Sequence, residues 1–309
     1  MNNIVFVLAV GRGKTLDKSI FLINSIKKYH PDAEIYSFVA EEETEEIDYA
    51  IKSFEEISTK VLYGEIPMKE YIFTVKHNAL IKAGKITKKK YLCCLDSDML
   101  LLQKFRLPPN HDMYVCPVDV GNTSWGREES REKWEELYKI AKAKMPKKKL
   151  YSLVDNREMF PYYNGGFVIT SDKQFGKKWL DLTSKIFKII ESYDSYDKYR
   201  SQSKRRRLFT RIPYSHWTEQ VSLTLLASKY NTLALGYDYD YPLNAMKSCP
   251  KNTKLIHYHD FRNLYKLESH RLQIDVYEYL INNYNKTTSK LKLKAYDFLR
   301  KIKIKMGKF

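Results

Sequence analysis

The sequence has few cysteines and no long hydrophobic segment. Its four cysteines show no metal-finger spacing, and the adjacent Cys93 and Cys94 would point to opposite faces of a strand, so we expect no disulfide framework. A reducing cytosol fits this pattern best. No run of about 18 apolar residues occurs, and Met1 leads directly into a strand-like segment, so the sequence predicts neither a transmembrane helix nor a signal peptide.

Positive charge is what the chain has in excess. The formal net charge of the 309 residues is +17, which favours a polyanionic partner: a nucleotide diphosphate, a nucleic acid or an anionic membrane. Charge alone does not choose among these three. A hydrophobic content of 43% supports a real core, and the length suits one sizeable α/β domain, with or without an added lobe.

Continuous apolar runs predict the central sheet. Ile4 to Val10 and Tyr91 to Leu95 lack the alternation of a half-buried strand, so we expect both to be buried on both faces. Glu34 to Ala40 is predicted as a further strand, and helices are predicted from about Asp17 to Tyr29 and from Met68 to Ala83. This alternation predicts a doubly wound, mostly parallel, Rossmann-like α/β sheet.

Two carboxylates follow the strand at Tyr91 to Leu95 directly. Because alternate residues of an extended chain point the same way, Asp96 and Asp98 are predicted to converge on one cation while Ser97 points aside. Their oxygen ligands suit Mn²⁺ or Mg²⁺. The alternative is that Asp-x-Asp is only a turn or a strand cap, which is its commoner role when it stands alone.

Other polar groups also lie where strands and helices begin or end. The turn Gly11 to Lys14 follows the first strand and lets backbone amides approach a phosphate, although it matches neither a Rossmann fingerprint nor a Walker loop. Lys76 flanks the apolar stripe of its helix and is either a surface lysine or a ligand-binding one. Asn164-Gly165-Gly166 precedes a predicted strand and is either a bulge or a close approach to a ligand.

Later in the chain, two pairs of residues are candidates for the same site. Glu219 and Gln220 begin a helix, where they complement its dipole or line a sugar pocket. His257 and His259 end a short strand two residues apart, so both imidazoles are predicted to face the same way, and either one is able to complete the metal site.

Three charged segments are predicted outside the core. Glu128 to Lys149 is predicted as a charged outer helix, and Lys204 to Arg207 as a solvated loop or an anion-binding flap. Lys290 to Phe309 has apolar residues at helical spacing among many lysines. That pattern is typical of a basic amphipathic helix on an anionic membrane, or of a frayed or core-docked terminal helix.

Taken in order, these motifs resemble those of the GT-A glycosyltransferases. The resemblance is to the family 8-like group that includes glycogenin and the bacterial lipooligosaccharide galactosyltransferases, and it covers most of Ile4 to Asp260. It implies a GT-A fold and the metal-dependent transfer of a sugar from a nucleotide-diphosphate sugar, with a UDP-sugar favoured. The implied acceptor is a hydroxyl of a glycan or of a lipid-linked molecule.

The resemblance also implies roles for individual residues. Asp98 and His257 would ligate Mn²⁺ or Mg²⁺ together with Asp96, which would touch the metal or the ribose. Glu219 and Gln220 would act in the sugar site: Glu219 as the base of an inverting enzyme, or as the group that orients the sugar in a retaining one. Donor binding would fall to the remaining residues: Ala9, Val10, Gly11, Arg12, Lys76, Asn164, Gly165 and Gly166.

The sequence departs from the family pattern at two positions. Gly165 stands where the family usually has Ala or Ser, and Asp260 stands where a glycine often follows the last histidine motif. The second departure concerns the diphosphate end of the site and leaves His257 and His259 as alternative ligands.

We expect a catalytic domain over residues 1–265, with a nucleotide-binding half over about 1–105 and an acceptor half over about 106–265. Residues 266–309 are expected to form a helical, basic, membrane-associating tail. The expected location is cytoplasmic, peripheral on the cytosolic face of a membrane.

Two other functions fit parts of the sequence. A nucleotidyltransferase also uses carboxylates, metal and an α/β sheet, but the basic turn at Gly11 to Lys14 matches its phosphate loop only in part. A non-catalytic protein that binds polyanions or membranes would use Lys204 to Arg207 and the basic tail. No RNA-binding signature with interleaved aromatic residues is present, so we do not expect a nucleic-acid partner.

Overall fold

The central element is a mixed β-sheet, as the computed structural model shows. The structure describes residues 3–11, 14–43, 51, 54–121, 123–197, 212–246 and 248–267. In these residues the sheet has seven strands in the order β10-β6-β9-β4-β1-β2-β3. Neighbouring strands are parallel except at β9, which is antiparallel to both β4 and β6. The strands are β1 (Ile4–Val10), β2 (Glu34–Ala40), β3 (Lys60–Gly64), β4 (Tyr91–Leu95), β6 (Met113–Pro117), β9 (Tyr163–Thr170) and β10 (Thr232–Ala234).

The predicted α/β architecture with a mainly parallel sheet is confirmed. All five residues of β4 are buried, as expected for a strand without alternation. Successive side chains of β1 enter two different cores: Val5 and Val7 pack in one, Phe6 and Leu8 in the other. Both faces of the sheet are therefore covered.

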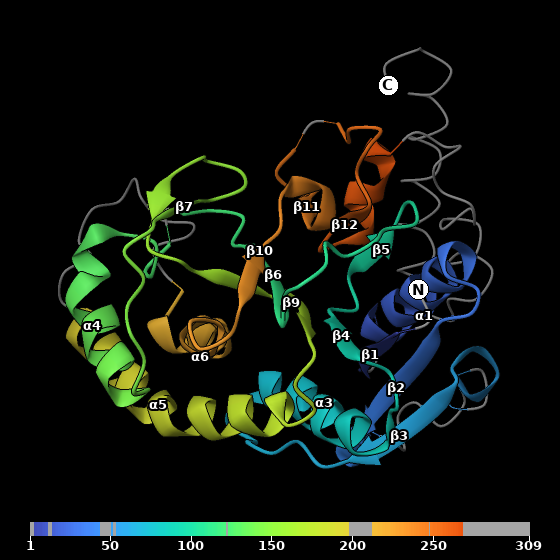
Figure 1. Ribbon diagram of the computed structural model, residues 1–309, viewed down its shortest axis with the longest axis horizontal. Helices are drawn as coiled ribbons and strands as arrows, with labels where there is room; N and C mark the ends of the chain where they lie inside the picture. The colour runs from blue at the N-terminus through green and yellow to red at the C-terminus, as the bar shows by residue number, and fades with distance from the viewer. Residues whose placement is uncertain are drawn as a thin grey trace, which may run out of the picture.

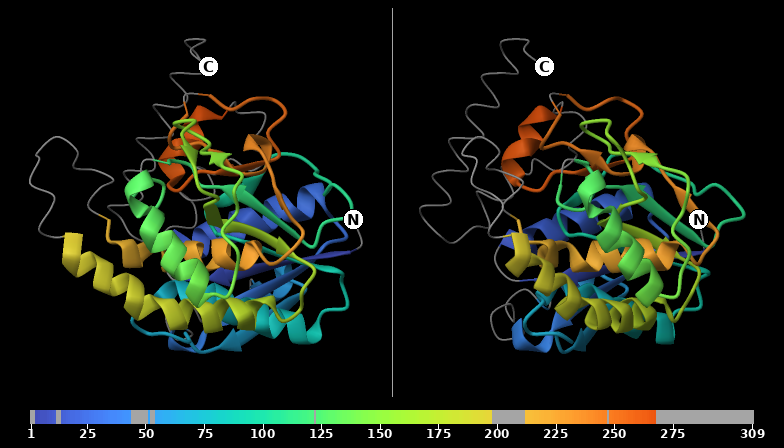
Figure 2. Two further views of the ribbon diagram at one scale, coloured as in Figure 1. Left: turned by 60° about the vertical axis from the view of Figure 1, so that its left-hand side comes forward. Right: turned by 90° about the vertical axis from the view of Figure 1, so that its left-hand side faces the viewer.

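Helices cover the two faces unequally. On one face, α1 (Lys14–Tyr29) packs Leu22 and Ile26 into the core that contains Phe6. On the other face lie α3 (Val75–Ile86), α5 (Phe175–Asp197) and α6 (Thr218–Ala227). The three helices lie together below the sheet in Figure 1, and the turned views of Figure 2 show the same layer. A 3-10 turn precedes two of them: η2 (Ile72–Thr74) before α3, and η4 (Tyr214–Trp217) before α6.

The prediction that Glu128 to Lys149 forms a helix outside the core is wrong. The structure has a 3-10 turn, η3 (Glu128–Ser130), and a shorter helix, α4 (Arg131–Ile140), which packs against the core. Trp134, Leu137 and Tyr138 form a buried stripe on α4, and the Trp134 indole donates to the backbone carbonyl of Trp125 at 2.9 Å. The many charged residues of α4 lie on its other face. The helix is therefore amphipathic, and its high charge content alone did not indicate this.

A small second sheet lies beyond the carboxyl end of β4. Its order is β11-β12-β5, from β11 (Tyr241–Pro242), β12 (Leu255–His257) and β5 (Met99–Leu101). Antiparallel pairing of β12 with β5 sets His257 opposite Met99, so His257 lies next to Asp98. The other short elements are β7 (Leu150–Tyr151), β8 (Glu158–Met159), and the 3-10 turns η1 (Glu41–Glu43), η5 (Tyr237–Tyr239) and η6 (Phe261–Lys266).

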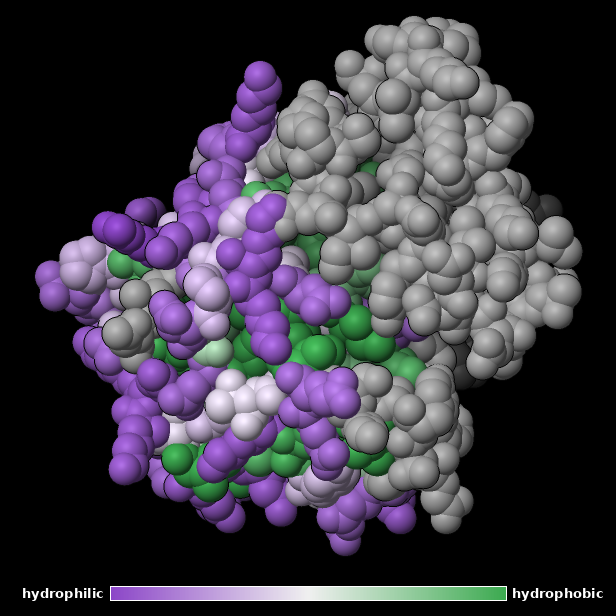
Figure 3. Space-filling view, turned by 90° about the vertical axis from the view of Figure 1, so that its right-hand side faces the viewer, coloured by the Kyte–Doolittle hydropathy of each residue, from purple (hydrophilic) through white to green (hydrophobic). Residues whose placement is uncertain are grey.

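Polar side chains cover much of the described surface on the face in Figure 3, with hydrophobic ones visible between them. Among the described residues, no helix is both long enough and apolar enough to cross a membrane. The predicted cluster at Lys204 to Arg207 and the predicted tail helix at Lys290 to Phe309 lie outside the described residues.

Candidate functional site

The turn between β4 and β5 carries Asp96, Ser97 and Asp98. Asp96 leaves the carboxyl end of β4, and the amide of Met99 donates to the Asp96 carbonyl at 3.1 Å, which closes the turn. The chain is therefore not extended here, so the prediction that strand alternation makes Asp96 and Asp98 point the same way does not apply. Asp96 and Asp98 instead enter two neighbouring clusters.

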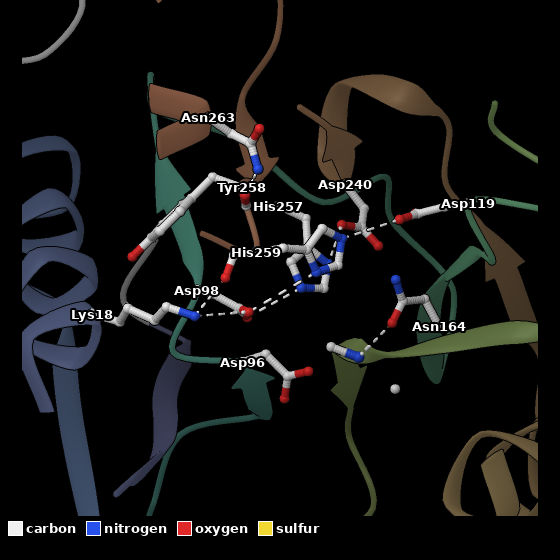
Figure 4. Close-up of polar contacts among 12 residues, drawn as sticks. Lys18, Asp96, Asp98, Asp119, Asn164, Asp240, His257, Tyr258, His259 and Asn263 are labelled. Carbon is white, nitrogen blue, oxygen red and sulfur yellow. Dashed lines mark hydrogen bonds and ion pairs between the residues drawn. The ribbon is translucent and has the colours of Figure 1, made fainter. Parts of the chain in front are cut away.

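Asp98 belongs to the first, which we call the aspartate–histidine cluster: Asp98, His257 and His259. Asp98 Oδ1 lies 3.1 Å from His257 Nε2, and Asp98 Oδ2 lies 4.0 Å from His259 Nδ1. One nitrogen or oxygen atom from each residue lies within 4.8 Å of the others, which is the spacing of a site that could hold a metal ion. Figure 4 shows the two rings facing the carboxylate.

The imidazoles of His257 and His259 both face Asp98, but not because of strand alternation, which was the predicted reason. Strand β12 ends at His257, and His259 follows with φ of 56°, in the left-handed region. The rings stack with centroids 4.0 Å apart and 23° between their planes. The left-handed backbone conformation thus positions His259. Both histidines that were predicted as alternative ligands lie beside Asp98.

A second carboxylate stands behind each histidine. His257 Nδ1 lies 3.3 Å from Asp240 Oδ1, and His259 Nε2 lies 3.4 Å from Asp119 Oδ2. Each imidazole therefore has one nitrogen toward Asp98 and the other toward an outer carboxylate. Histidines that bind metals commonly use their second nitrogen in this way, so the residues present fit a divalent cation. Asp240 is fully buried, and its carboxylate lies beside the His257 ring.

The charges of the aspartate–histidine cluster hold it together. Burial would raise the pKa of Asp98, but the charges of His257, Lys18 and His259 outweigh burial and lower it well below its usual range. Burial would likewise lower the pKa of His257, yet Asp98 and Asp240 raise it well above normal. Both pKa shifts favour the charged forms, an imidazolium at His257 and a carboxylate at Asp98.

Asp96 belongs to the second group, which we call the lysine–carboxylate cluster: Lys76, Asp96 and Glu219. The Lys76 ammonium donates to Asp96 Oδ1 at 2.7 Å, to the Gly165 carbonyl at 3.2 Å and to Glu219 Oε1 at 3.4 Å. Lys76 and Glu219 are both buried, so Lys76 is not a surface lysine. Burial raises the pKa of Glu219 despite the nearby ammonium, and the two carboxylates raise the pKa of Lys76 although burial opposes them.

Asn164, Gly165 and Gly166 lie inside β9, not before it as the sequence suggested. A Cβ at Gly165 would come within 2.3 Å of Glu219 Oε2, and a Cβ at Gly166 would come within 3.0 Å of Asp96 Oδ2. Asn164 Oδ1 accepts a hydrogen bond from the Gly166 amide at 2.9 Å. The glycine at position 165 therefore makes room for the Glu219 carboxylate.

A cavity of about 430 Å³ joins the two clusters. It is lined by seven residues that the sequence singled out: Asp96, Asp98, Asn164, Glu219, Gln220, His257 and His259. Asp119 also lines it, and aromatic residues form another part of its wall: Phe73, Tyr162, His216 and Trp217.

Ala9, Val10 and Gly11 lie at the carboxyl end of β1, one strand from Asp96, because Leu8 pairs with Leu95. They are not among the residues that line the cavity. Arg12 lies outside the described residues.

Sequence reasoning missed three residues of the site: Lys18, Asp119 and Asp240. The Lys18 ammonium lies 3.4 Å from Asp98 Oδ2 and donates to the carbonyl of His259 at 2.6 Å. Asp119 follows the apolar strand β6, which is the signal that identified Asp96 after β4, whereas Lys18 and Asp240 have no comparable local signal.

Open α/β sheets bind their ligands at the carboxyl edge, and here acidic and imidazole side chains surround a cavity at that edge. Residues 4–230 match the Rhodobacterales glycosyltransferase domain, and the chain belongs to that family. No curated protein matches the chain. The family supports sugar transfer as the activity, with a nucleotide-sugar donor and an acceptor.

Proposed function

We propose that this protein is a metal-dependent hexosyltransferase of the GT-A type, similar to the glycogenin and lipooligosaccharide galactosyltransferase group. It would move a sugar from a nucleotide-diphosphate sugar, with UDP-sugar favoured, to a hydroxyl of a glycan or a lipid-linked acceptor. The observation that carries this proposal is the aspartate–histidine cluster, which opens into the same cavity as Glu219.

The chemistry of the ligand set supports a divalent cation. One carboxylate and two imidazoles favour a transition metal such as Mn²⁺ over Mg²⁺, which prefers oxygen ligands and keeps its waters. Asp98, His257 and His259 would hold the cation, and Asp240 and Asp119 would orient the two imidazoles. A bound cation would offset the negative charge that develops on the diphosphate leaving group.

The lysine–carboxylate cluster supports a role at the donor sugar. Lys76 is held by two carboxylates and a carbonyl, so we assign it a positioning role: it fixes Asp96 and Glu219 at the cavity wall. Glu219 Oε2 is buried and has no hydrogen-bond partner, which leaves it available to a sugar hydroxyl. In inverting transfer Glu219 would take the proton of the acceptor hydroxyl, and in retaining transfer it would orient the donor sugar. Gln220 and Asn164 would supply amide hydrogen bonds beside it.

The remaining assignments rest on the sequence. Ala9, Val10, Gly11 and Arg12 would hold the nucleotide, next to the strand that carries Asp96. Residues 1–265 would form the catalytic domain. The basic pattern at Lys290 to Phe309 supports a tail that places the enzyme on the cytosolic face of an anionic membrane.

A thermal-shift experiment tests the proposal. UDP, GDP, CDP and several nucleotide sugars are each added with and without Mn²⁺. A ligand at about 100 times its Kd stabilises the folded state by about 2.7 kcal/mol, so we expect UDP to raise the Tm by several degrees only when Mn²⁺ is present. Asp98→Asn should abolish this shift and the transfer reaction.

The matched control is Asp112→Asn. Asp112 is exposed and directly precedes β6, at the opposite edge of the sheet, so its loss should leave the shift intact. The proposal is wrong if Mn²⁺ produces no nucleotide-dependent shift, or if Asp98→Asn retains near-normal turnover.

A further inference from the structure

Lys18 contacts the aspartate–histidine cluster but has no part in the function proposed above. It projects from the second turn of α1, and Figure 4 shows its ammonium reaching Asp98 from the side opposite the outer carboxylates. It lies 3.4 Å from Asp98 Oδ2, which is also the oxygen nearest His259 Nδ1. A positive charge therefore already stands beside an oxygen that a divalent cation would use.

We propose that Lys18 couples binding of the divalent cation to binding of the donor's diphosphate. Without a nucleotide, the ammonium neutralises Asp98 and opposes the cation. When the diphosphate is present, its negative charge attracts both the ammonium and the cation, and Lys18 becomes a diphosphate ligand. This inference rests on the proposed function and adds to it a residue that makes the cation and the nucleotide bind together.

The position of Lys18 between two predicted subsites supports this role. The helix that carries it follows β1 in the chain, and the nucleotide is predicted to bind where β1 ends. The Lys18 ammonium lies at the predicted cation site. In a nucleotide sugar, the diphosphate is the part that joins these two places. Lys18 therefore lies where the diphosphate would pass.

The contacts of Lys18 also leave it able to change partners. Lys76 is buried among two carboxylates and a carbonyl, with Asp96 Oδ1 only 2.7 Å away. Lys18 has one carboxylate at 3.4 Å and the carbonyl of His259 at 2.6 Å, and 15% of its side chain is exposed. The ammonium can thus keep its bond to the carbonyl while it exchanges Asp98 for a phosphate oxygen.

The test measures two affinities of the full-length protein with opposite expected changes. In Lys18→Met the stem is kept and the charge is lost. Titrated with Mn²⁺ alone and followed by the signal of free Mn²⁺ in electron paramagnetic resonance, this variant should bind Mn²⁺ about tenfold more tightly than the wild type. With saturating Mn²⁺, it should bind UDP about tenfold more weakly by calorimetry, and UMP with a smaller loss.

Two controls separate charge from a structural role. Lys27→Met removes an exposed lysine from the last turn of the same helix and should change neither affinity. Lys18→Arg keeps the charge and should retain most of the UDP affinity. Loss of packing alone would weaken both ligands or neither.

The outcomes distinguish this inference from the function on which it rests. Tighter Mn²⁺ binding together with weaker UDP binding supports the coupling. If the wild type binds both ligands and Lys18→Met leaves both constants within about twofold, or weakens Mn²⁺, the coupling is wrong and the proposed function stands. If the wild type binds neither Mn²⁺ nor UDP with Mn²⁺ present, both are wrong.

Discussion

Replacing Gly165 with alanine should disable the sugar site without disturbing the cation site. The new Cβ would lie 2.3 Å from Glu219 Oε2 and 2.6 Å from Oε1. Glycine 165 has no positive φ, so the backbone itself tolerates alanine and the effect comes from this clash alone. The carboxylate has to move.

The size of that movement sets the expected loss. Restoring even 3.0 Å, below which real Cβ contacts essentially do not occur, takes a shift of about 0.7 Å. Glu219 is buried and tied to Lys76, so it cannot swing freely. A misplacement of about 1 Å at a catalytic group costs up to about 100-fold in rate, so we expect turnover to fall about 10- to 100-fold. Overpacking of this kind should also lower stability by about 1–3 kcal/mol.

The assay compares donor turnover, urea unfolding and Mn²⁺-dependent UDP binding. UDP binding should stay near the wild-type value, because the three atoms nearest to the new Cβ all belong to Glu219, outside the aspartate–histidine cluster. Gly236→Ala is the matched control: its Cβ would meet nothing closer than 3.7 Å. In the double variant with Glu219→Asp, the shorter side chain should relieve the clash, so its stability loss should be smaller than the sum of the single losses by about 1 kcal/mol. Wild-type turnover and stability in Gly165→Ala would refute the placement of Glu219.

Two further predictions concern buried charge. Lys76→Met should destabilise the protein by about 3–5 kcal/mol in urea unfolding, because Glu219 is left buried without the Lys76 ammonium. The control is Lys85→Met, on the exposed side of the same helix, which should change stability by less than about 0.5 kcal/mol. Equal effects of the two substitutions would contradict the buried cluster. His30 is buried, and burial lowers its pKa from 6.5 to about 4, so its stabilising contribution is complete above pH 6.5 and is lost as the pH falls toward 4. The loss of stability amounts to about 3 kcal/mol. When unfolding is measured from pH 7 to pH 4, His30→Phe should lose less stability than the wild type. Identical pH profiles would disprove the lowered pKa of His30.

The strands that sequence could predict are those whose burial requires no knowledge of their neighbours. Ile4–Val10 and Tyr91–Leu95 have the predicted bounds, because continuous apolar runs specify burial on both faces. Glu34–Ala40 also has its predicted bounds. The antiparallel direction of β9 depends on its pairing with β4 and β6, which no local pattern records. Gly165 and Gly166 were predicted to lie before the strand, but they lie within β9, where side chains from elsewhere in the chain occupy the space that a Cβ would need.

Strand order alone predicts only the site residues that follow or end a strand. Asp96, Asp98 and His257 follow or end apolar strands, so their arrival at one edge of the fold follows from topology. Lys18 reaches Asp98 across 80 positions of sequence and His259 across 241, from a helix whose pattern predicts only its buried face. Such contacts arise from how α1 and the small sheet pack, and no spacing in the sequence encodes them.

The charge of the site opposes the charge of the chain. The lysine–carboxylate cluster carries two carboxylates and one ammonium, and Asp98, Asp119 and Asp240 add three carboxylates against Lys18 before the histidines are counted. A net charge of +17 attracts anions over the molecule as a whole, but the described side chains of this site would repel a diphosphate that arrives alone. A divalent cation would change the balance, because it would add two positive charges at the point where Asp98 and the histidines meet. We infer that the cation selects the nucleotide's diphosphate here, and that the basic surface only increases how often the nucleotide arrives.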